Sequence, residues 1–316
     1  MQNIFLLGGT GFVGSRVCAK LVDEGFSVTV PTRRGTAARH LQHLPGVTVL
    51  EMNVHDEAAL ALAADGHDAV VNLIAILHGS AAAFDKTHVV LPQKIARVCQ
   101  AKGIGKLVHV SALGVNGTRP GVEPSEYLRS KGRGEVVLQR AAAESALELT
   151  MLRPSVIFGA HDKFLNLFAR LQAVFPVMPL AGANARFQPV WVDDVAAAIV
   201  LSLARSVQRQ PPGGAVRIVE ACGPDVFTLK ELVQLSAQLS GCNGGRGRPV
   251  IALPEWMGRL QAMAMEFAPG PTLMSRDNLD SMKVDNVATG LVSGLQSLGI
   301  TPAELRPIAQ SYLANA

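Results

Sequence analysis

The stretch that decides the fold is LLGGTGFVG, residues 6–14, which continues an apolar run at 3–7. Gly8, Gly11 and Gly14 recur at intervals of three where a strand would lead into a helix. Glycine permits the tight turn, lets a pyrophosphate approach the bare backbone and leaves the helix N-terminus open to the anion. The stretch therefore predicts a dinucleotide site at the end of the first strand. A glycine-rich turn without a ligand is the alternative.

Strand and helix patterns alternate through the first half of the chain. Short apolar runs predict strands at 3–7, 27–30, 47–51, 69–75, 106–111 and 148–153. Amphipathic segments predict helices between them at 13–24, 56–64, 84–101 and 125–143. Strands that alternate with helices make right-handed crossovers, which produce a parallel sheet covered on both faces. We therefore expect an α/β fold with a Rossmann-type doubly wound parallel sheet.

The regular alternation of strand and helix patterns ends after Pro154. Helices are predicted at 163–174, 193–206, 228–240, 254–267 and 301–314, with short strands at 186–190, 215–220 and 249–252. Thr228 with Glu231, and Thr301 with Glu304, have the spacing of capping boxes. We expect a dinucleotide-binding domain at 1–160, to which 186–222 returns. Residues 161–185 and 223–316 would form a smaller mixed C-terminal lobe for a substrate or partner.

The composition of the chain limits the classes of protein to which it can belong. The 316 residues are 48% hydrophobic and 17% charged, with a net charge of +4, which is typical of a well-buried globular chain. So mild a basic bias permits an anionic cofactor but does not argue for nucleic acid. The four cysteines form no CxxC pair and the histidines have no ligand spacing, so we expect no metal and a reducing compartment. Apolar runs are too short to span a bilayer, and we expect a cytoplasmic protein, with peripheral attachment at the inner face of the membrane left open.

The end of the second strand bears on the cofactor. An NAD site usually has Asp or Glu about 20 residues after the glycines. In SVTVPTRRG, residues 27–35, Thr32 stands there and is followed by Arg33 and Arg34. Two guanidinium groups suit a 2′-phosphate, so the sequence favours NADP(H) over NAD(H). The alternative is two solvated arginines in a loop, with NAD(H) bound less selectively.

The stretch YLRSK, residues 127–131, places a lysine four positions after one of only two tyrosines. On a helix this spacing puts Tyr127 and Lys131 on one face. The pair would serve as a proton relay in an oxidoreductase, or it would be two polar residues on the solvated side of a helix.

Motifs along most of the chain resemble the extended or atypical branch of the short-chain dehydrogenase/reductase superfamily. They are GGTGFVG (8–14), NV (53–54), NLIA (72–75), HVSALG (109–114), YLRSK (127–131), RPSVIFG (153–159) and FQPVWVDDVAAAI (187–199). The late segment LMSRDNLDSMKVDNV (273–287) narrows the resemblance to bacterial relatives of the nucleotide-binding accessory subunit of respiratory complex I. That group also includes proteins tied to ubiquinone biosynthesis, and its NADPH is tightly held.

The resemblance implies roles for individual residues. Tyr127 would exchange a proton with substrate, Lys131 would bind the nicotinamide ribose and lower the pKa of the tyrosine, and Ser111 would bond the reacting oxygen or the cofactor. Extended enzymes usually carry a second hydroxyl where this chain has Leu113, which counts against turnover. The implied cofactor-binding residues are Gly8, Thr10, Gly11, Phe12, Val13, Gly14, Arg33, Arg34, Asn53, Val54, Leu73, Ile74, Ala75, Tyr127, Lys131, Pro154 and Val156.

Two functions remain open. The first is an NADP(H)-binding accessory or regulatory protein linked to complex I or ubiquinone metabolism, with a respiratory-complex or membrane-associated partner. The alternative is an active NADPH-dependent reductase or epimerase-type enzyme that uses Tyr127 and Lys131 on a small hydrophobic, quinone-like substrate.

In the helix at 254–267, Trp256, Leu260 and Phe267 share one face. That face would dock a partner or a membrane surface, or it would pack on the lobe.

Overall fold

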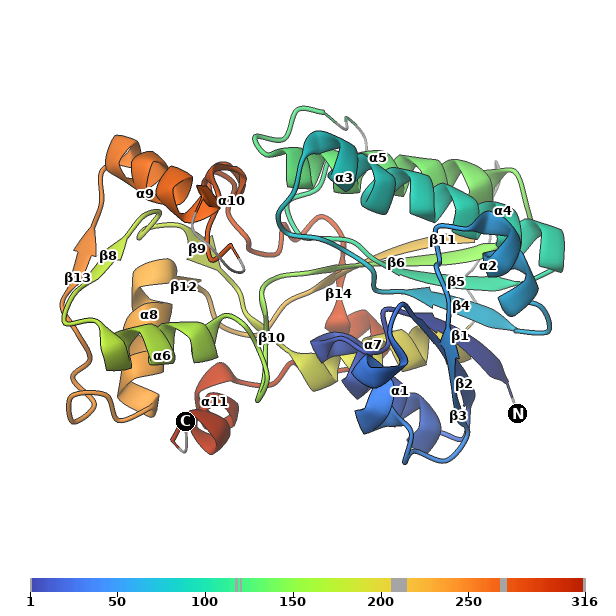
Figure 1. Ribbon diagram of the computed structural model, residues 1–316, viewed down its shortest axis with the longest axis horizontal. Helices are drawn as coiled ribbons and strands as arrows, with labels where there is room; N and C mark the ends of the chain where they lie inside the picture. The colour runs from blue at the N-terminus through green and yellow to red at the C-terminus, as the bar shows by residue number, and fades with distance from the viewer. Residues whose placement is uncertain (1, 117–118, 120, 206–214, 268–271, 315–316) are drawn as a thin grey trace.

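The computed structural model describes residues 2–116, 119, 121–205, 215–267 and 272–314. Its centre is an eight-stranded sheet in the order β14-β11-β6-β5-β4-β1-β2-β3, and all neighbouring strands run parallel (Figure 1). The strands are β1 (Asn3–Leu7), β2 (Ser27–Thr32), β3 (Val47–Glu51), β4 (Ala69–Asn72), β5 (Lys106–Val110), β6 (Glu148–Pro154), β11 (Ala215–Ala221) and β14 (Ser293–Gly294). Chain order reverses between β1 and β4, which confirms the predicted Rossmann-type doubly wound sheet.

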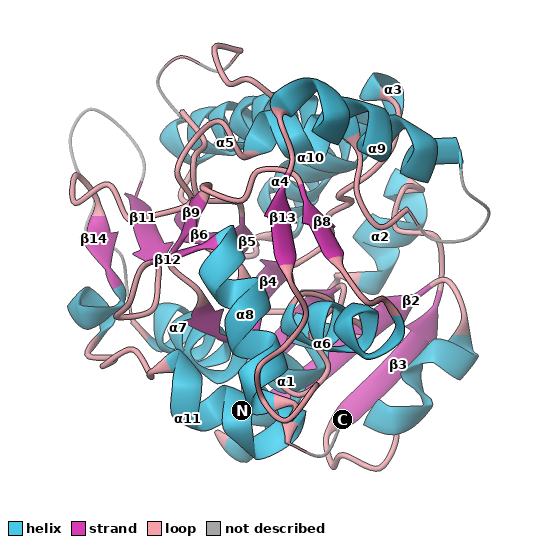
Figure 2. Cartoon of the chain, turned by 90° about the vertical axis from the view of Figure 1, so that its left-hand side faces the viewer, coloured by secondary structure: helices cyan, strands magenta, loops and turns pink. Residues whose placement is uncertain are grey.

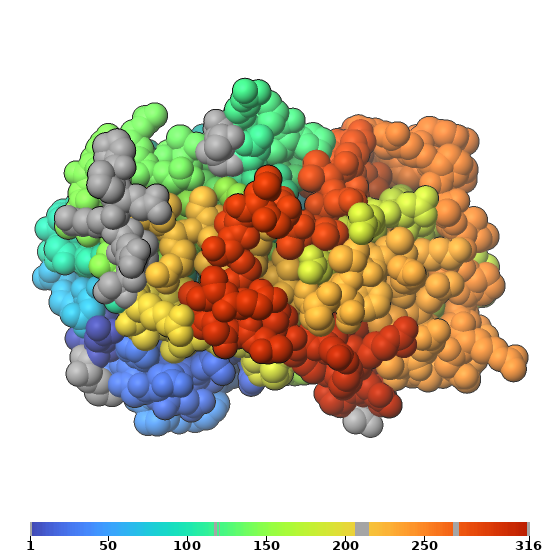
Figure 3. Space-filling model, turned by 180° about the vertical axis from the view of Figure 1, so that it is seen from behind, coloured from blue at the N-terminus to red at the C-terminus, as the bar shows by residue number. Residues whose placement is uncertain are grey.

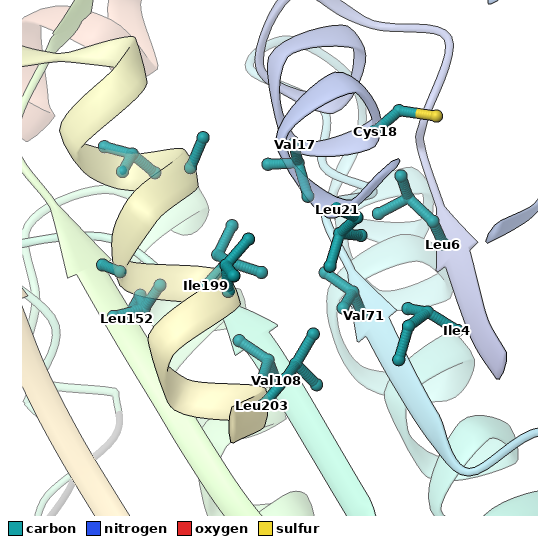
Figure 4. Close-up of a cluster of buried hydrophobic side chains, with 14 of the residues drawn as sticks. Ile4, Leu6, Val17, Cys18, Leu21, Val71, Val108, Leu152, Ile199 and Leu203 are labelled. Atoms are coloured by element: carbon teal, nitrogen blue, oxygen red, sulfur yellow. The ribbon is translucent and has the colours of Figure 1, made fainter. Parts of the chain in front are cut away.

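Helices cover both faces of this sheet. On one face lie α1 (Phe12–Asp23) and α7 (Val192–Ala204), and on the other α2 (Glu57–Ala63), α4 (Leu91–Lys102) and α5 (Glu126–Ala143). Because side chains alternate along a strand, Ile4 and Leu6 of β1 pack with α1 and α7, while Phe5 packs against α4. Figure 4 shows the first of these clusters, in which Leu21 of α1 and Ile199 of α7 meet the sheet.

The helix predicted at 84–101 is present and contains a π-helical segment. It consists of α3 (Ala81–Asp85), a π-helical segment η2 (Lys86–Val90) and then α4. The π-helical segment packs on α5 at Gly134, where a Cβ would lie 1.9 Å from the carbonyl oxygen of His88. The predicted helix is confirmed, but the π turn within it was not predicted, because such a turn depends on a close approach like this one and has no periodic signature in sequence.

The rest of the chain builds a smaller mixed lobe with three two-stranded sheets (Figure 2). Its strands are β7 (Ile157–Phe158) with β10 (Val190–Trp191), β8 (Met178–Leu180) with β13 (Val250–Ala252), and β9 (Arg186–Phe187) with β12 (Phe227–Thr228). Its helices are α6 (Leu165–Val174), α8 (Leu229–Leu239), α9 (Glu255–Phe267), α10 (Arg276–Ser281) and α11 (Leu305–Leu313). The 3₁₀ segments η1 (Gly35–Leu41) and η3 (Leu295–Leu298) lie instead beside the main sheet, η1 next to β2 and β3 and η3 next to β11 and β14. Within the described residues, no helix is both long and apolar enough to cross a membrane.

The residue boundaries given to the two lobes stay a prediction. Strand β11, from the stretch 186–222, joins the main sheet beside β6, and β14, from the stretch assigned to the smaller lobe, joins it beside β11. The predicted helix 193–206 is α7, and residue 206 lies outside the described residues.

The two predicted capping boxes have different outcomes. Thr228 and Glu231 form the box at the start of α8. The box at Thr301 and Glu304 was wrong, because α11 begins only at Leu305 and Glu304 is extended. The backbone N–H of Ala303 donates instead to Asp194 Oδ2 at 2.8 Å, which holds this segment outside the helix.

Candidate dinucleotide site

The glycine turn after β1 requires glycine at positions 8 and 14 for internal reasons. Gly8 has a φ of +85°, which a residue with a side chain rarely adopts. A Cβ on Gly14 would lie 2.1 Å from the carbonyl oxygen of Gly8, so α1 can approach the strand end only with glycine there. The turn thus brings the N-terminus of α1 directly above β1.

Gly11 has no such internal reason. Its φ is an ordinary −83°, and a Cβ there would meet only the Gly8 carbonyl oxygen, at 3.4 Å. Gly11 is exposed at the N-cap of α1, where no side chain caps the helix and the first turn has no acidic residue. A bare backbone beside free N–H groups suits a pyrophosphate, so this turn fits the predicted cofactor. Thr10, Phe12 and Val13 flank it on the turn and on the first turn of α1.

A cavity of about 640 Å³ opens at the carboxyl ends of β2 and β3. Its lining residues are Arg33, Glu51, Met52, Asn53, His55, Ile76, Ala83, Lys86 and Thr87. Strand ends at this edge of a doubly wound sheet are the usual place for the adenosine half of a dinucleotide. The π-helical segment contributes Lys86 and Thr87, which sequence reasoning missed because the loop after β4 gave no sign of folding back on β3.

The cavity is electropositive around His55. Burial lowers the pKa of His55, and the nearby cations Lys86, Lys94 and Arg33 lower it further. Lys94 Nζ also donates to the carbonyl oxygen of His55 at 2.6 Å. These charges favour an anionic group in the cavity.

One carboxylate stands among these cations. Glu51 pairs with Thr32 across the strands, and its Oε2 accepts a hydrogen bond from the backbone N–H of Gly35 at 2.8 Å. The prediction of NADP(H) from Thr32, Arg33 and Arg34 considered only the end of β2 and overlooked the carboxylate at the end of β3. Arg33 lines the cavity, whereas the backbone of Arg34 is bound to the Thr32 hydroxyl and Arg34 is not among the lining residues.

Other predicted cofactor residues lie at the same edge of the sheet. Asn53 lines the cavity, and Val54 is buried in the core beneath it. After β4, a Cβ on Gly8 would lie 3.2 Å from Leu73 Cβ and 3.4 Å from a side-chain carbon of Ile74, so this loop touches the glycine turn. The neighbouring Ala75 is exposed.

The predicted catalytic residues gather at the ends of β5 and β6. Lys131 is 1% exposed, and its Nζ donates to the carbonyl oxygen of Val110 at 2.8 Å. Burial lowers the pKa of Lys131 to about 8, against the opposing effect of Glu135. Ser111 is 3% exposed, and its Oγ has no hydrogen-bond partner within the described structure. A buried hydroxyl without a partner costs stability, so this one is best explained by a ligand that the site is built to receive.

Tyr127 packs beside the loop after β5, against Ala112 and Val115. Its ring makes edge-to-face contacts with His88, at a centroid distance of 5.5 Å, and with Phe84, at 6.2 Å. Burial raises the pKa of Tyr127 to about 12, whereas the resemblance implied a lowered value. At neutral pH the phenol is therefore protonated and suited to donate rather than accept a proton.

His88 supports this arrangement, and sequence reasoning missed it. Its Nε2 accepts from the backbone N–H of Ile76 at 3.1 Å, which leaves Nδ1 as the donor to Ser130 Oγ at 2.8 Å. Burial, together with Lys131 and Arg133, lowers the pKa of His88 to about 3, so it stays neutral. His88 thus links the loop after β4 to the helix that carries Tyr127.

The loop after β5 differs from the expectation for an active enzyme in one respect. Leu113 is 1% exposed and its backbone N–H donates to the carbonyl oxygen of Pro154 at 3.0 Å. Beside Pro154, the backbone N–H of Val156 donates to Asn286 Oδ1 at 3.1 Å. Asn286 belongs to the late segment 273–287, which is part of the orange-red to red end of the chain that runs across the molecule in Figure 3.

Fold and site together define a Rossmann dinucleotide-binding protein of the short-chain dehydrogenase/reductase class, with a Tyr–Lys pair on the helix after β5. The chain belongs to the NAD dependent epimerase/dehydratase family, whose model matches residues 4–218.

Its relatives include subunits of mitochondrial complex I. It is 27% identical to NADH dehydrogenase (ubiquinone) 1 alpha subcomplex subunit 9 of Arabidopsis thaliana, covering 98% of this chain and 76% of that protein. The Mus musculus protein of the same name is 29% identical, covering 96% of this chain and 78% of that protein. The NADH-ubiquinone oxidoreductase 40 kDa subunit of Neurospora crassa is 24% identical and covers 98% and 80% respectively.

Solved structures show the same fold. MoeE5 in complex with UDP-glucose and NAD matches with a TM-score of 0.71 at 18% identity, over 98% of this chain and 97% of that one. UDP-glucose 4-epimerase of Thermotoga maritima matches with a TM-score of 0.70 at 19% identity, over 99% and 97%.

Proposed function

We propose that this protein holds NADP(H) and acts as an accessory or regulatory protein linked to respiratory complex I or to ubiquinone metabolism. The observation that carries the proposal is the match of nearly the whole chain, 98%, to the Arabidopsis complex I subunit, with the late segment included. Leu113 in place of a substrate-orienting hydroxyl supports a held cofactor over rapid turnover. We place the protein in the cytoplasm, with peripheral contact at the inner face of the membrane.

The residues of the site fit this cofactor. The turn Gly8–Gly14 would receive the pyrophosphate, Arg33 and Lys86 the 2′-phosphate, and Lys131 the nicotinamide ribose. A bound nicotinamide supplies hydride-transfer chemistry. Glu51 limits the preference for NADP(H), because its carboxylate faces the same cavity as Arg33.

The test is to denature freshly purified protein and identify the released nucleotide and its redox state by mass spectrometry and absorbance. We expect near-stoichiometric NADPH that stays reduced after long exposure to air and to candidate quinones. Nucleotide that exchanges freely, or an excess of bound NADH over NADPH, would contradict the proposal.

A second candidate is an active NADPH-dependent reductase or epimerase-type enzyme on a small hydrophobic, quinone-like substrate. It is favoured by the protonated Tyr127 phenol and by the buried Ser111 hydroxyl, which has no partner in the described structure; both groups suit hydrogen bonding to a substrate oxygen. One relative, 2-alkyl-3-oxoalkanoate reductase of Stenotrophomonas maltophilia, is 30% identical over 52% of this chain. For this function, Tyr127→Phe should abolish turnover and leave nucleotide binding nearly unchanged. Under the accessory function the variant should still support complex I activity in cells.

The exposed face of α9 has the character of a contact site for another protein. The helix packs through its small residues Gly258 and Ala262, and it exposes Trp256 by 65%, Leu260 by 52% and Phe267 by 80%. Large apolar side chains grouped on one exposed face are typical of interaction sites. We propose that this face contacts a respiratory-complex or membrane-associated protein. Leu260→Glu should then abolish co-sedimentation with membranes while the released nucleotide stays unchanged, and the same substitution at Leu62 of α2, which is 78% exposed, is the matched control. Unaltered sedimentation of Leu260→Glu would refute the contact.

A further inference from the structure

The N-terminus of α5, the helix that carries Tyr127 and Lys131, is capped by a residue far along the chain. The backbone N–H groups of Glu126 and Tyr127 donate to Asp277 Oδ1 and Oδ2 at 2.6 and 3.0 Å. The N–H of Leu128 donates to the side chain of Ser125 at 3.2 Å. The first three N–H groups of an α-helix have no partner within the helix, so Asp277 supplies two of the three caps of α5.

Asp277 also places a negative charge at the N-terminus of α5. Glu126 stands in the first turn, but its carboxylate is bound by Arg129 at 3.0 Å and by Arg133 at 2.7 Å, so its charge is compensated. Asp277 makes no ion pair with any described residue. Its charge therefore faces the positive end of the dipole of an 18-residue helix.

Asp277 is itself held firmly. It lies in α10, which begins with a capping box of Ser275 and Asn278. The hydroxyl of Ser281, one turn later, donates to Ser125 Oγ at 2.8 Å. We call residues 275–286 the strap, because they run from this contact to Asn286, which accepts from Ser155 Oγ at 2.6 Å beside β6.

Ion pairs connect the strap to α9 on its other side. Arg259 of α9 pairs with Asp280 at 2.9 Å, and Glu266 of α9 pairs with Arg276 at 2.9 Å. The strap is therefore bound both to the smaller lobe and to the loops at the carboxyl edge of the main sheet. The position of Asp277 depends on both parts of the molecule.

We propose that Asp277 is a positioning residue for Tyr127. Its carboxylate, carried by the strap, fixes the first turn of α5 and so sets where the Tyr127 ring lies at the nicotinamide end of the site. The positioning of Tyr127 by Asp277 does not require a bound cofactor. The effect of Asp277 on cofactor binding rests on the proposed function above.

The two members of the Tyr–Lys pair depend on Asp277 to different degrees. Tyr127 is the second residue of α5, and its own N–H is bound by the carboxylate. Lys131 lies one turn later, where the bond of its Nζ to Val110 holds it independently. Loss of the carboxylate should therefore displace Tyr127 and leave Lys131 in place.

The presence of only two tyrosines, Tyr127 and Tyr312, makes this testable. Protein labelled with 3-fluorotyrosine should give two ¹⁹F resonances, and Tyr127→Phe assigns them. In nucleotide-free protein, Asp277→Ala should shift or broaden the Tyr127 resonance and leave that of Tyr312 unchanged. Asp277→Asn keeps one acceptor oxygen and the side-chain size, so it should fold normally and give a smaller change in the same direction.

The matched control is Asp285→Ala, which removes another carboxylate of the strap, one that pairs only at the surface with Arg186 at 3.4 Å. It should move neither resonance. A Tyr127 resonance that is unaltered in both Asp277 variants, or that moves equally in Asp285→Ala, would overturn the proposal. For the cofactor, we expect the NADPH dissociation constant to rise roughly twofold to fivefold in Asp277→Ala. If the resonance moves while the wild-type protein binds no nucleotide, Asp277 positions Tyr127 and the proposed cofactor function fails.

Discussion

Lys131 Nζ donates a hydrogen bond to the main-chain oxygen of Val110 at 2.8 Å, in a setting where the lysine is only 1% exposed. One neutral acceptor does not compensate for the hydration that a buried ammonium loses, so the pKa of Lys131 falls to about 8. The bond ties α5 to the end of β5 and leaves two donors of Nζ for other acceptors.

This buried amine makes stability depend on pH. The folded-state pKa of Lys131, about 8, lies below the ordinary lysine value of 10.5. Between these values the unfolded chain binds a proton that the folded chain does not, so the free energy of unfolding rises with pH. We expect a contribution of about 2 kcal/mol between pH 8 and 9.5 from urea denaturation. Lys131→Met should remove this rise, and Lys86→Met, at an exposed lysine, should keep it. An identical rise in Lys131→Met would assign it to another group.

Ser111 should show opposite effects on stability and on binding. Its buried Oγ has no partner among the described residues, so Ser111→Ala should stabilise the nucleotide-free protein by about 1 kcal/mol. The same variant should bind NADPH more weakly, because a ligand contact is lost. Ser130 is the matched control, since its hydroxyl bonds both His88 and the Tyr127 carbonyl, and Ser130→Ala should destabilise. Thermal denaturation and isothermal titration would measure both, and a destabilised Ser111→Ala would refute the assignment.

The two arginines after β2 should differ in their effect on cofactor choice. Arg33 lines the cavity, and Arg34 is not among its lining residues. We expect Arg33→Gln to weaken NADPH binding about tenfold and to leave NADH binding nearly unchanged, which is the effect of one lost charge-assisted bond. Arg34→Gln should change either constant much less. Equal losses for both nucleotides in Arg33→Gln would show that the guanidinium does not read the 2′-phosphate.

The buried ion pair of Glu135 and Arg153 should govern the stability of the sheet edge on which the site stands. The two groups are joined by hydrogen bonds of 2.9 and 2.5 Å, and Glu135 is fully buried. Glu135→Gln leaves a guanidinium without its partner charge and should cost about 3 kcal/mol in urea denaturation. The double variant Glu135→Leu with Arg153→Met should be less destabilised than Glu135→Gln. A greater loss in the double variant would mean that packing, rather than charge, makes this pair stabilising.

Much of the fold could be predicted because it depends on local patterns. The strands at 3–7 and 47–51 coincide with β1 and β3, and the alternation of strand and helix implied their parallel order. The glycines could be assigned to a dinucleotide turn because their spacing reflects the close approach of Gly14 to Gly8.

Other features of the site could not be predicted because they join distant segments. The π-helical segment and His88 depend on how closely Gly134 lets α5 approach. Glu51 ends a strand that is separate from Arg33 in sequence, and only the pairing of β2 with β3 makes them neighbours. The late segment was expected to be specific to a group of relatives, but nothing in its sequence indicated which helix it caps.

The class of fold, the glycine turn and the Tyr127–Lys131 spacing could be predicted before folding is considered, because each arises from steric and periodic rules within a few residues. Tertiary structure alone decided the chemistry of the pair. Burial raises the pKa of Tyr127 and lowers that of Lys131, and the carboxylate of Asp277 closes their helix from 150 residues away. Desolvation and charge depend on what surrounds a group in space, and that surrounding is assembled only when the two parts of the chain pack together.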